Sequence, residues 1–185
     1  LLLYQAGWLA CVLGAANGLP WVGALAAAGI VGWHLVRAAR PSREVALIAA
    51  AIVLGAVFET LLLQTGWVRF DTGVLLAGTA PYWMVALWAI FATTLNVSLR
   101  ALRPYPWMAA AFGALGAPAA YYAGANLGAM EFAATGLALV AIGIGWAIRS
   151  TQKTCFGISS SGPCDRVIGS VRSAMPAPGS SKWRA

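Results

Sequence analysis

Six apolar stretches follow one another through residues 1–149, and short segments with turn residues and charges separate them. A transmembrane helix needs roughly 20 predominantly apolar residues. The stretches cover about 1–17, 20–39, 44–67, 80–101, 106–128 and 131–149. This arrangement predicts an all-α, polytopic membrane protein with six transmembrane helices.

Composition argues against a soluble fold. The chain is 61% hydrophobic and only 9% charged, whereas ordinary soluble proteins are about 25% charged. Twelve Lys and Arg residues against five acidic residues give a net charge of +7. These basic residues gather between the apolar stretches. The tendency of membrane proteins to keep positively charged loops in the cytoplasm explains this placement better than nucleic-acid binding does. We expect membrane lipids, and no nucleic acid, as partners.

The loop charges predict the orientation of the helices. Basic residues follow the second, fourth and sixth stretches: Arg37, Arg40 and Arg43; Arg100 and Arg103; Arg149 and Lys153. The opposite loops hold Arg69, balanced by Asp71, and Glu131. Tryptophans lie near the expected outer ends (Trp21, Trp67, Trp83) and inner ends (Trp33, Trp107, Trp146). Both termini should therefore lie on the cytoplasmic side of the membrane.

A change of composition marks the end of the membrane domain. Residues 1–149 form the predicted six-helix transmembrane domain, and residues 150–185 form a polar, basic tail with many Ser, Gly and Pro residues. Such a segment cannot bury enough apolar surface to offset its ordering entropy. A partner or the helix bundle would have to hold it in an ordered state. Cys155 and Cys164 would lie in the reducing cytoplasm, so we expect no disulfide there.

The third stretch contains a carboxylate. Glu59 lies about four residues beyond the middle of the expected span, in its outer half. Intramembrane carboxylates are costly and usually face the interior of a helix bundle. Thr60 and Gln64 are four residues apart and share a helix face next to Glu59. Two interpretations stay open: a carboxylate that handles protons or a ligand, and an interhelical hydrogen bond that fixes packing.

The fifth stretch offers partners for Glu59. Tyr121, Tyr122 and Asn126 lie at the same expected depth as Glu59 and Gln64. Together these five residues are our candidate ligand-binding site, an outer-leaflet polar pocket between stretches three, four and five. A GxxxG pattern at 124–128 would let another helix approach closely, and Pro118 frees a backbone carbonyl. Ordinary helix packing is the alternative.

A second polar group belongs to the inner half. His34 is expected to be structural or solvated, and Thr93 and Asn96, three residues apart, can bond across helices. Arg100 and Arg103 are candidate contacts for lipid head groups.

Known catalytic patterns are missing from the sequence. It contains no GxSxG, HExxH or Gly-rich phosphate loop, and one histidine with three cysteines in no CxxC pair forms no metal site. We therefore predict no catalytic residue, no metal and no cofactor. The chain is more consistent with a non-enzyme, although the pattern does not decide this.

Three segments resemble a known family. FETLLLQTGW (58–67), PYWMVALWAIFATTLNVSL (81–99) and FGALGAPAAYYAGANLGAM (112–130) are similar to the bacterial integral membrane family catalogued as domain of unknown function 2878. The likeness covers about residues 1–149 and leaves out the tail. It implies a multi-pass protein of the bacterial inner (cytoplasmic) membrane and no specific activity. The family's genes often lie near those for fatty-acid modification, which implies lipid chemistry in the envelope by association only.

Two functions from different classes follow. The first is an accessory or scaffold subunit of a larger membrane complex, without catalytic machinery. The second is a lipid-handling protein, either an enzyme partner or a small carrier, that uses the polar pocket around Glu59. A proton-coupled transporter is a third idea, which would need a water path to Glu59.

Overall fold

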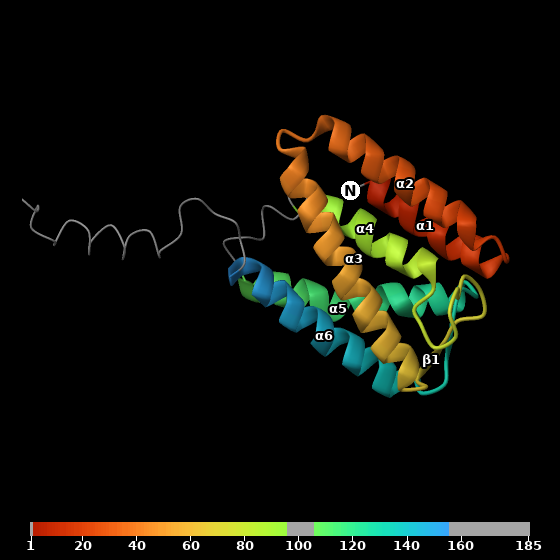
Figure 1. Cartoon of the computed structure of the whole chain (residues 1–185). Coiled ribbons are helices and arrows are strands. Elements are labelled where there is room, and N and C mark those ends of the chain that lie inside the picture. Colours follow the sequence, from red (N-terminus) through yellow and green to blue (C-terminus); the bar gives the residue numbers. More distant parts are fainter. Residues whose placement is uncertain (1, 96–105, 156–185) are drawn as a thin grey trace, which may run out of the picture. The chain divides into compact units, whose positions relative to one another are not determined.

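The computed structural model describes residues 2–95 and 106–155, and these residues form six helices and two short strands. The helices are α1 (Leu2–Ala16), α2 (Pro20–Arg37), α3 (Pro41–Gln64), α4 (Tyr82–Leu95), α5 (Pro106–Asn126) and α6 (Thr135–Cys155). The strands are β1 (Val68–Arg69) and β2 (Glu131–Phe132). The predicted all-α class and the six helices are confirmed (Figure 1).

Among the described residues, α3 is the helix that is both long enough and apolar enough to cross a membrane. Its 24 residues give a length of about 36 Å at 1.5 Å per residue. Three shorter apolar helical segments are also present in the described part of the chain: α1 (Leu2–Ala16), α4 (Tyr82–Leu95) and the part of α6 from Thr135 to Ala147. Helices α2 and α5, with 18 and 21 residues, are long enough but not apolar enough by the same test.

Helix α4 is the centre of the bundle. Nine of its residues are buried, and it packs against α1, α2 and α3 (Figure 1). Its two threonines can lie in this apolar interior because their hydroxyl groups donate to the helix's own carbonyl groups. Thr93 Oγ1 donates to Ile90 O, and Thr94 Oγ1 donates to Phe91 O, each at 2.7 Å. No buried hydroxyl is left unsatisfied at these positions, which keeps the cost of burial low.

Small residues allow the helices to approach closely. A Cβ atom at Gly23 of α2 would lie 2.4 Å from Cys11 Cα of α1, and one at Gly7 would lie 2.7 Å from Ile30 Cδ1. These glycines let the backbones of α1 and α2 come close to each other.

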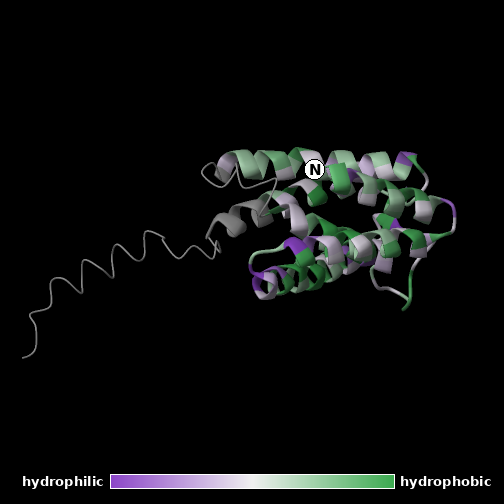
Figure 2. Cartoon of the chain, turned by 90° about the horizontal axis from the view of Figure 1, so that it is seen from above, coloured by the Kyte–Doolittle hydropathy of each residue, from purple (hydrophilic) through white to green (hydrophobic). Residues whose placement is uncertain are grey.

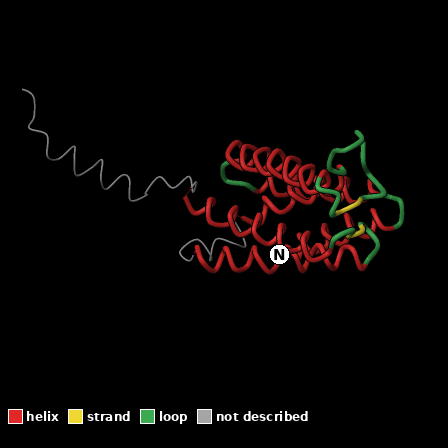
Figure 3. The backbone as a smooth tube through the Cα atoms, turned by 90° about the horizontal axis from the view of Figure 1, so that it is seen from below, coloured by secondary structure: helices red, strands yellow, loops and turns green. Residues whose placement is uncertain are grey.

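The two strands form a small antiparallel pair at one end of the bundle (Figure 3). Val68 pairs with Phe132, and Arg69 pairs with Glu131. The predicted start of the sixth helix at residue 131 is therefore wrong. Residues 131 and 132 extend to meet β1, and α6 begins at Thr135.

The segment 124–128 contains the end of α5. Gly128 has a φ of 85°, and Ala129 N donates to Gly124 O at 3.1 Å while Gly128 N donates to Ala125 O at 2.9 Å. These bonds are a Schellman motif, in which a residue with positive φ satisfies the last carbonyl groups of a helix. The two glycines of the GxxxG pattern also face another helix, because Cβ atoms at Gly124 and Gly128 would lie 4.0 Å from Val12 Cγ2 and 3.8 Å from Ala16 Cβ of α1.

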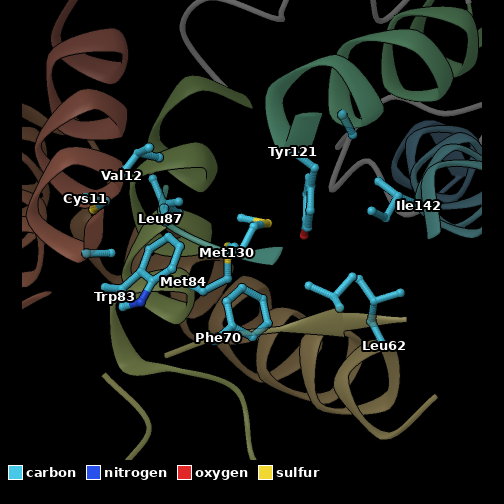
Figure 4. Close-up of a cluster of buried hydrophobic side chains, with 14 of the residues drawn as sticks. Cys11, Val12, Leu62, Phe70, Trp83, Met84, Leu87, Tyr121, Met130 and Ile142 are labelled. Atoms are coloured by element: carbon cyan, nitrogen blue, oxygen red, sulfur yellow. The ribbon is translucent and has the colours of Figure 1, made fainter. Parts of the chain in front are cut away.

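The core continues from the helices into the loops at this end. Trp83, Phe70 and Met130 pack together there (Figure 4). Trp83 has no exposed surface, and its indole Nε1 donates to Thr72 O at 3.1 Å. Trp83 is therefore a core residue and not the interfacial residue that its position near a helix end suggested.

The described helices belong to one compact unit that ends at Thr154. Helix α6 continues to Cys155, beyond the expected end of the sixth span at residue 149. The rest of the predicted tail, 156–185, lies outside the described residues.

Candidate functional site

One face of α3 turns toward the interior, and Glu59 lies on it. The buried residues of α3 recur at intervals of three or four: Ile48, Ala51, Gly55, Glu59 and Leu62. This spacing produces a single stripe along an α-helix. Glu59 has 0% of its surface exposed.

Two donors from different helices meet one oxygen of Glu59. Trp88 Nε1 on α4 donates to Glu59 Oε1 at 2.9 Å, and the Tyr121 hydroxyl on α5 donates to the same oxygen. The donors follow Glu59 by 29 and 62 residues. The carboxyl group therefore connects α3, α4 and α5 at one point, which we call the carboxyl junction (Glu59, Trp88 and Tyr121).

Aromatic packing holds Trp88 in place. Its ring stacks on Trp146 of α6 with 4.7 Å between centroids, and Phe58 meets its edge at 6.1 Å. Phe91 in turn contacts the edge of Trp146 at 4.8 Å. Edge and stacked pairs of this kind contribute about 0.5–1.5 kcal/mol each beyond their buried area.

Glycines make this packing possible. A Cβ atom at Gly55 would lie 2.2 Å from Trp88 Cγ, and one at Gly145 would lie 2.6 Å from Phe58 Cε2. Gly55 is four residues before Glu59, on the same face of α3. The helix therefore offers a recess for the indole ring and, one turn later, the acceptor for its N–H group.

The chemistry of the junction suits the fixing of helices. Burial of a carboxyl group is unfavourable unless hydrogen bonds compensate for the lost water. Here an indole and a phenol, which also need partners when buried, supply them. The enclosing side chains leave Glu59 no contact with the surface.

The structure brings together only some of the predicted ligand-binding residues. Glu59 and Tyr121 are in contact. Gln64 and Asn126 are exposed, Tyr122 is 52% exposed, and Asn126 Nδ2 donates to Tyr122 O at 3.0 Å. Consecutive residues of a helix point about 100° apart, so Tyr122 cannot share the inward direction of Tyr121. Equal depth in the bundle did not mean equal direction.

The polar residues predicted for the inner half do not form one cluster among the described residues. His34 Nε2 lies 3.0 Å from Glu44 Oε2, and this pair joins the end of α2 to the first turn of α3. Arg100, Arg103 and Asn96 lie outside the described residues.

Trp88 is the member of the junction that sequence reasoning missed. One signal could have found it, because a tryptophan within an apolar helix needs an acceptor for its N–H group. Glu59 is the acidic residue that lies deepest within an apolar stretch, so it was the natural acceptor for the Trp88 N–H group.

A shallow apolar groove of about 390 Å³ lies between α5 and α6, away from Glu59. Its lining residues are Ala114, Leu139, Val140, Gly143, Ile144 and Ala147. Pro118 cannot donate to Ala114 O, and Gly143 packs so near this carbonyl that a Cβ atom there would lie 3.0 Å from it. The carbonyl that Pro118 frees is thus covered by α6.

Comparison with protein families identifies the chain. The model of the family described as protein of unknown function (DUF2878) matches residues 1–151. The chain belongs to this family. The resemblance expected from the three sequence segments is thereby confirmed, and the DUF2878 match includes all three residues of the carboxyl junction. No curated protein and no solved structure shows a significant match.

Proposed function

We propose that this DUF2878 protein is a non-catalytic, six-span protein of the bacterial inner membrane and an accessory or scaffold subunit of a membrane complex. The closed carboxyl junction is the observation that carries the proposal. The Glu59 carboxyl group is costly to bury, but it accepts hydrogen bonds from two neighbouring helices and has no exposed surface. A scaffold needs fixed helix positions, and such a bond provides them.

The apolar surface supports several membrane crossings. Exposed large apolar residues occur along five helices, and they include Leu9 and Leu13; Leu25 and Val36; Val53, Val57 and Leu61; Phe112 and Leu115; Val140 and Ile144. Figure 2 shows hydrophobic residues along the outer sides of the helices. Monomeric soluble proteins rarely expose apolar patches of more than a few hundred Å². Lipid, or another membrane subunit, is the environment that this surface fits.

Charge at the two ends supports the orientation with both termini inside. Arg37, Arg40 and Arg43 are exposed around the α2–α3 turn. At the strand end, Arg69 lies opposite Glu131 in the β-pair, so the charges there offset each other. This difference is the one expected when the α2–α3 turn faces the cytoplasm.

The decisive experiment is isolation of the full-length chain from native membranes in two mild detergents. We expect it to migrate in native gels with at least one other membrane protein at a constant ratio in both. A chain that elutes alone from both detergents would overturn the scaffold function.

Substitutions at Glu59 distinguish a structural carboxyl group from a chemical one. Glu59→Gln keeps an acceptor oxygen for Trp88 and Tyr121, so we expect assembly to persist. Glu59→Leu leaves two buried donors without this acceptor, at a cost of about 1–3 kcal/mol each, and assembly should fail. Equal loss with both substitutions would instead indicate that the protein needs an ionisable group.

The lipid-handling function has one observation in its favour, the apolar groove between α5 and α6. An acyl chain would fit a surface without polar lining. Ala114→Leu would fill the groove, with Leu115→Ile at an exposed neighbouring position as the control. Lipid that co-purifies with the wild type and the control, and not with Ala114→Leu, would favour this function over a scaffold.

A further inference from the structure

The loop between β1 and α4 ends in an apolar tip. Val74, Leu75 and Leu76 are 37%, 76% and 69% exposed. No charged residue occurs between Thr72 and Pro81. A loop in water is normally polar, so this composition needs an explanation from its surroundings.

Hydrogen bonds fix the first arm of the loop to the bundle. Thr72 Oγ1 donates to Ala15 O of α1 at 3.0 Å. Trp83 Nε1 donates to Thr72 O at 3.1 Å, and Tyr82 N donates to Gly73 O at 2.9 Å. These bonds join the loop to the end of α1 and to the start of α4.

The second arm is held equally well. Thr79 donates to Leu76 O through both N, at 3.1 Å, and Oγ1, at 2.8 Å. Ala80 N donates to Thr60 Oγ1 of α3 at 3.1 Å. With both arms fixed, the leucines cannot turn inward without loss of these bonds, so their exposure is built into the loop.

The start of α2 extends the same apolar surface. A Cβ atom at Gly73 would lie 3.3 Å from Pro20 Cβ, and the residues on either side of Pro20, Leu19 and Trp21, are about half exposed. Tryptophan is enriched where a membrane meets water. We call Leu19, Trp21, Val74, Leu75 and Leu76 the loop-end patch.

We propose that the loop-end patch is a lipid anchor that inserts into the outer leaflet at the boundary between head groups and acyl chains. The inference rests on the proposed membrane-spanning function. Interfacial apolar groups reach about 5–10 Å into this boundary. The irregular backbone of the loop keeps it out of the hydrocarbon centre, where lipid-exposed loops do not occur. Phospholipid fits better than a protein partner because the tip offers apolar side chains without the charges that would select a partner.

A fluorescent label at the tip tests the proposal. The 185-residue chain with Cys155→Ser and Cys164→Ser keeps only Cys11, which is fully buried. Single cysteines then replace Leu75 at the tip, Asp71 in the same loop as the matched control, or Val53 in α3. Each variant carries an NBD label and is reconstituted in phosphatidylethanolamine–phosphatidylglycerol vesicles, with or without lipid that bears a nitroxide near the glycerol end of its acyl chain.

The expected result is a blue-shifted emission at position 75 that the nitroxide lipid quenches, and a red-shifted, weakly quenched emission at position 71. The label at position 53 reports membrane insertion by its own blue shift. If position 53 is shifted while position 75 emits as in water, the anchor is refuted and the membrane-spanning function survives. A blue-shifted label at position 75 without quenching would indicate a protein contact and also overturn the anchor. Water-like emission at both position 53 and position 75 would overturn the lipid anchor and the membrane-spanning function together.

Discussion

Gly55→Ala is the sharpest test of the carboxyl junction. The added methyl group would lie 2.2 Å from Trp88 Cγ, 2.5 Å from Cδ2 and 2.6 Å from Cδ1. The indole ring must therefore move. It cannot move independently, because it stacks on Trp146 and donates to Glu59 Oε1.

The expected cost follows from three effects. Overpacking of a well-packed core costs about 1–3 kcal/mol. A strained or broken bond from Trp88 to the buried carboxyl group costs about 1–3 kcal/mol more. Alanine recovers up to about 1 kcal/mol through its higher helix propensity. The net loss of unfolding free energy is thus about 1–6 kcal/mol.

The measurement is reversible unfolding in mixed micelles with increasing SDS, followed by circular dichroism. Gly32→Ala on α2 is the matched control, since no atom lies within 4 Å of the added methyl group and only the gain in propensity should remain. Equal unfolding curves for the two variants would show that Gly55 does not provide a recess for Trp88.

Three further predictions concern single contacts. Tyr121→Phe removes one donor to Glu59 and should cost about 1–3 kcal/mol in the same unfolding assay. The control Tyr122→Phe, at a half-exposed site, should change the unfolding curve little. A larger loss of stability for Tyr122→Phe than for Tyr121→Phe would exclude the assigned junction. Gly128→Ala forces alanine to a φ of 85° and should cost about 1–2 kcal/mol, read as a lower unfolding midpoint; an unchanged midpoint would refute the cap. His34→Ala breaks the partly exposed pair with Glu44 and should cost at most about 1 kcal/mol, so a loss as large as that of Tyr121→Phe would contradict this assignment.

The sequence predicted the six helices well because each lies within an apolar stretch that turn residues or charges separate from the next. It failed at residues 131 and 132, where a distant segment of the chain determines the backbone conformation. Glu131 and Phe132 were assigned to a helix, but they pair with β1, a partner more than sixty residues away. Gly124 and Gly128 do face α1, but the sequence pattern did not indicate that Gly128 also has the positive φ of a helix cap.

The candidate site was predicted in part, for a geometric reason. Position along a helix gives depth, and depth correctly placed Tyr121 near Glu59. Direction around the helix axis depends on how the helices rotate against each other, which the sequence does not state. Gln64, Tyr122 and Asn126 share the expected depth and are nevertheless exposed.

The order of synthesis gives the carboxyl junction a further consequence. Glu59 is made 62 residues before Tyr121, an interval of about 3–12 s at about 5–20 residues per second. In the membrane setting that we propose, α3 enters the bilayer while its carboxyl group still lacks this donor, and Trp88 is made first. Closure of the bundle therefore waits for α5. A nascent chain halted before Tyr121 would hold a polar group that the insertion machinery, or a neighbouring subunit, has to shield.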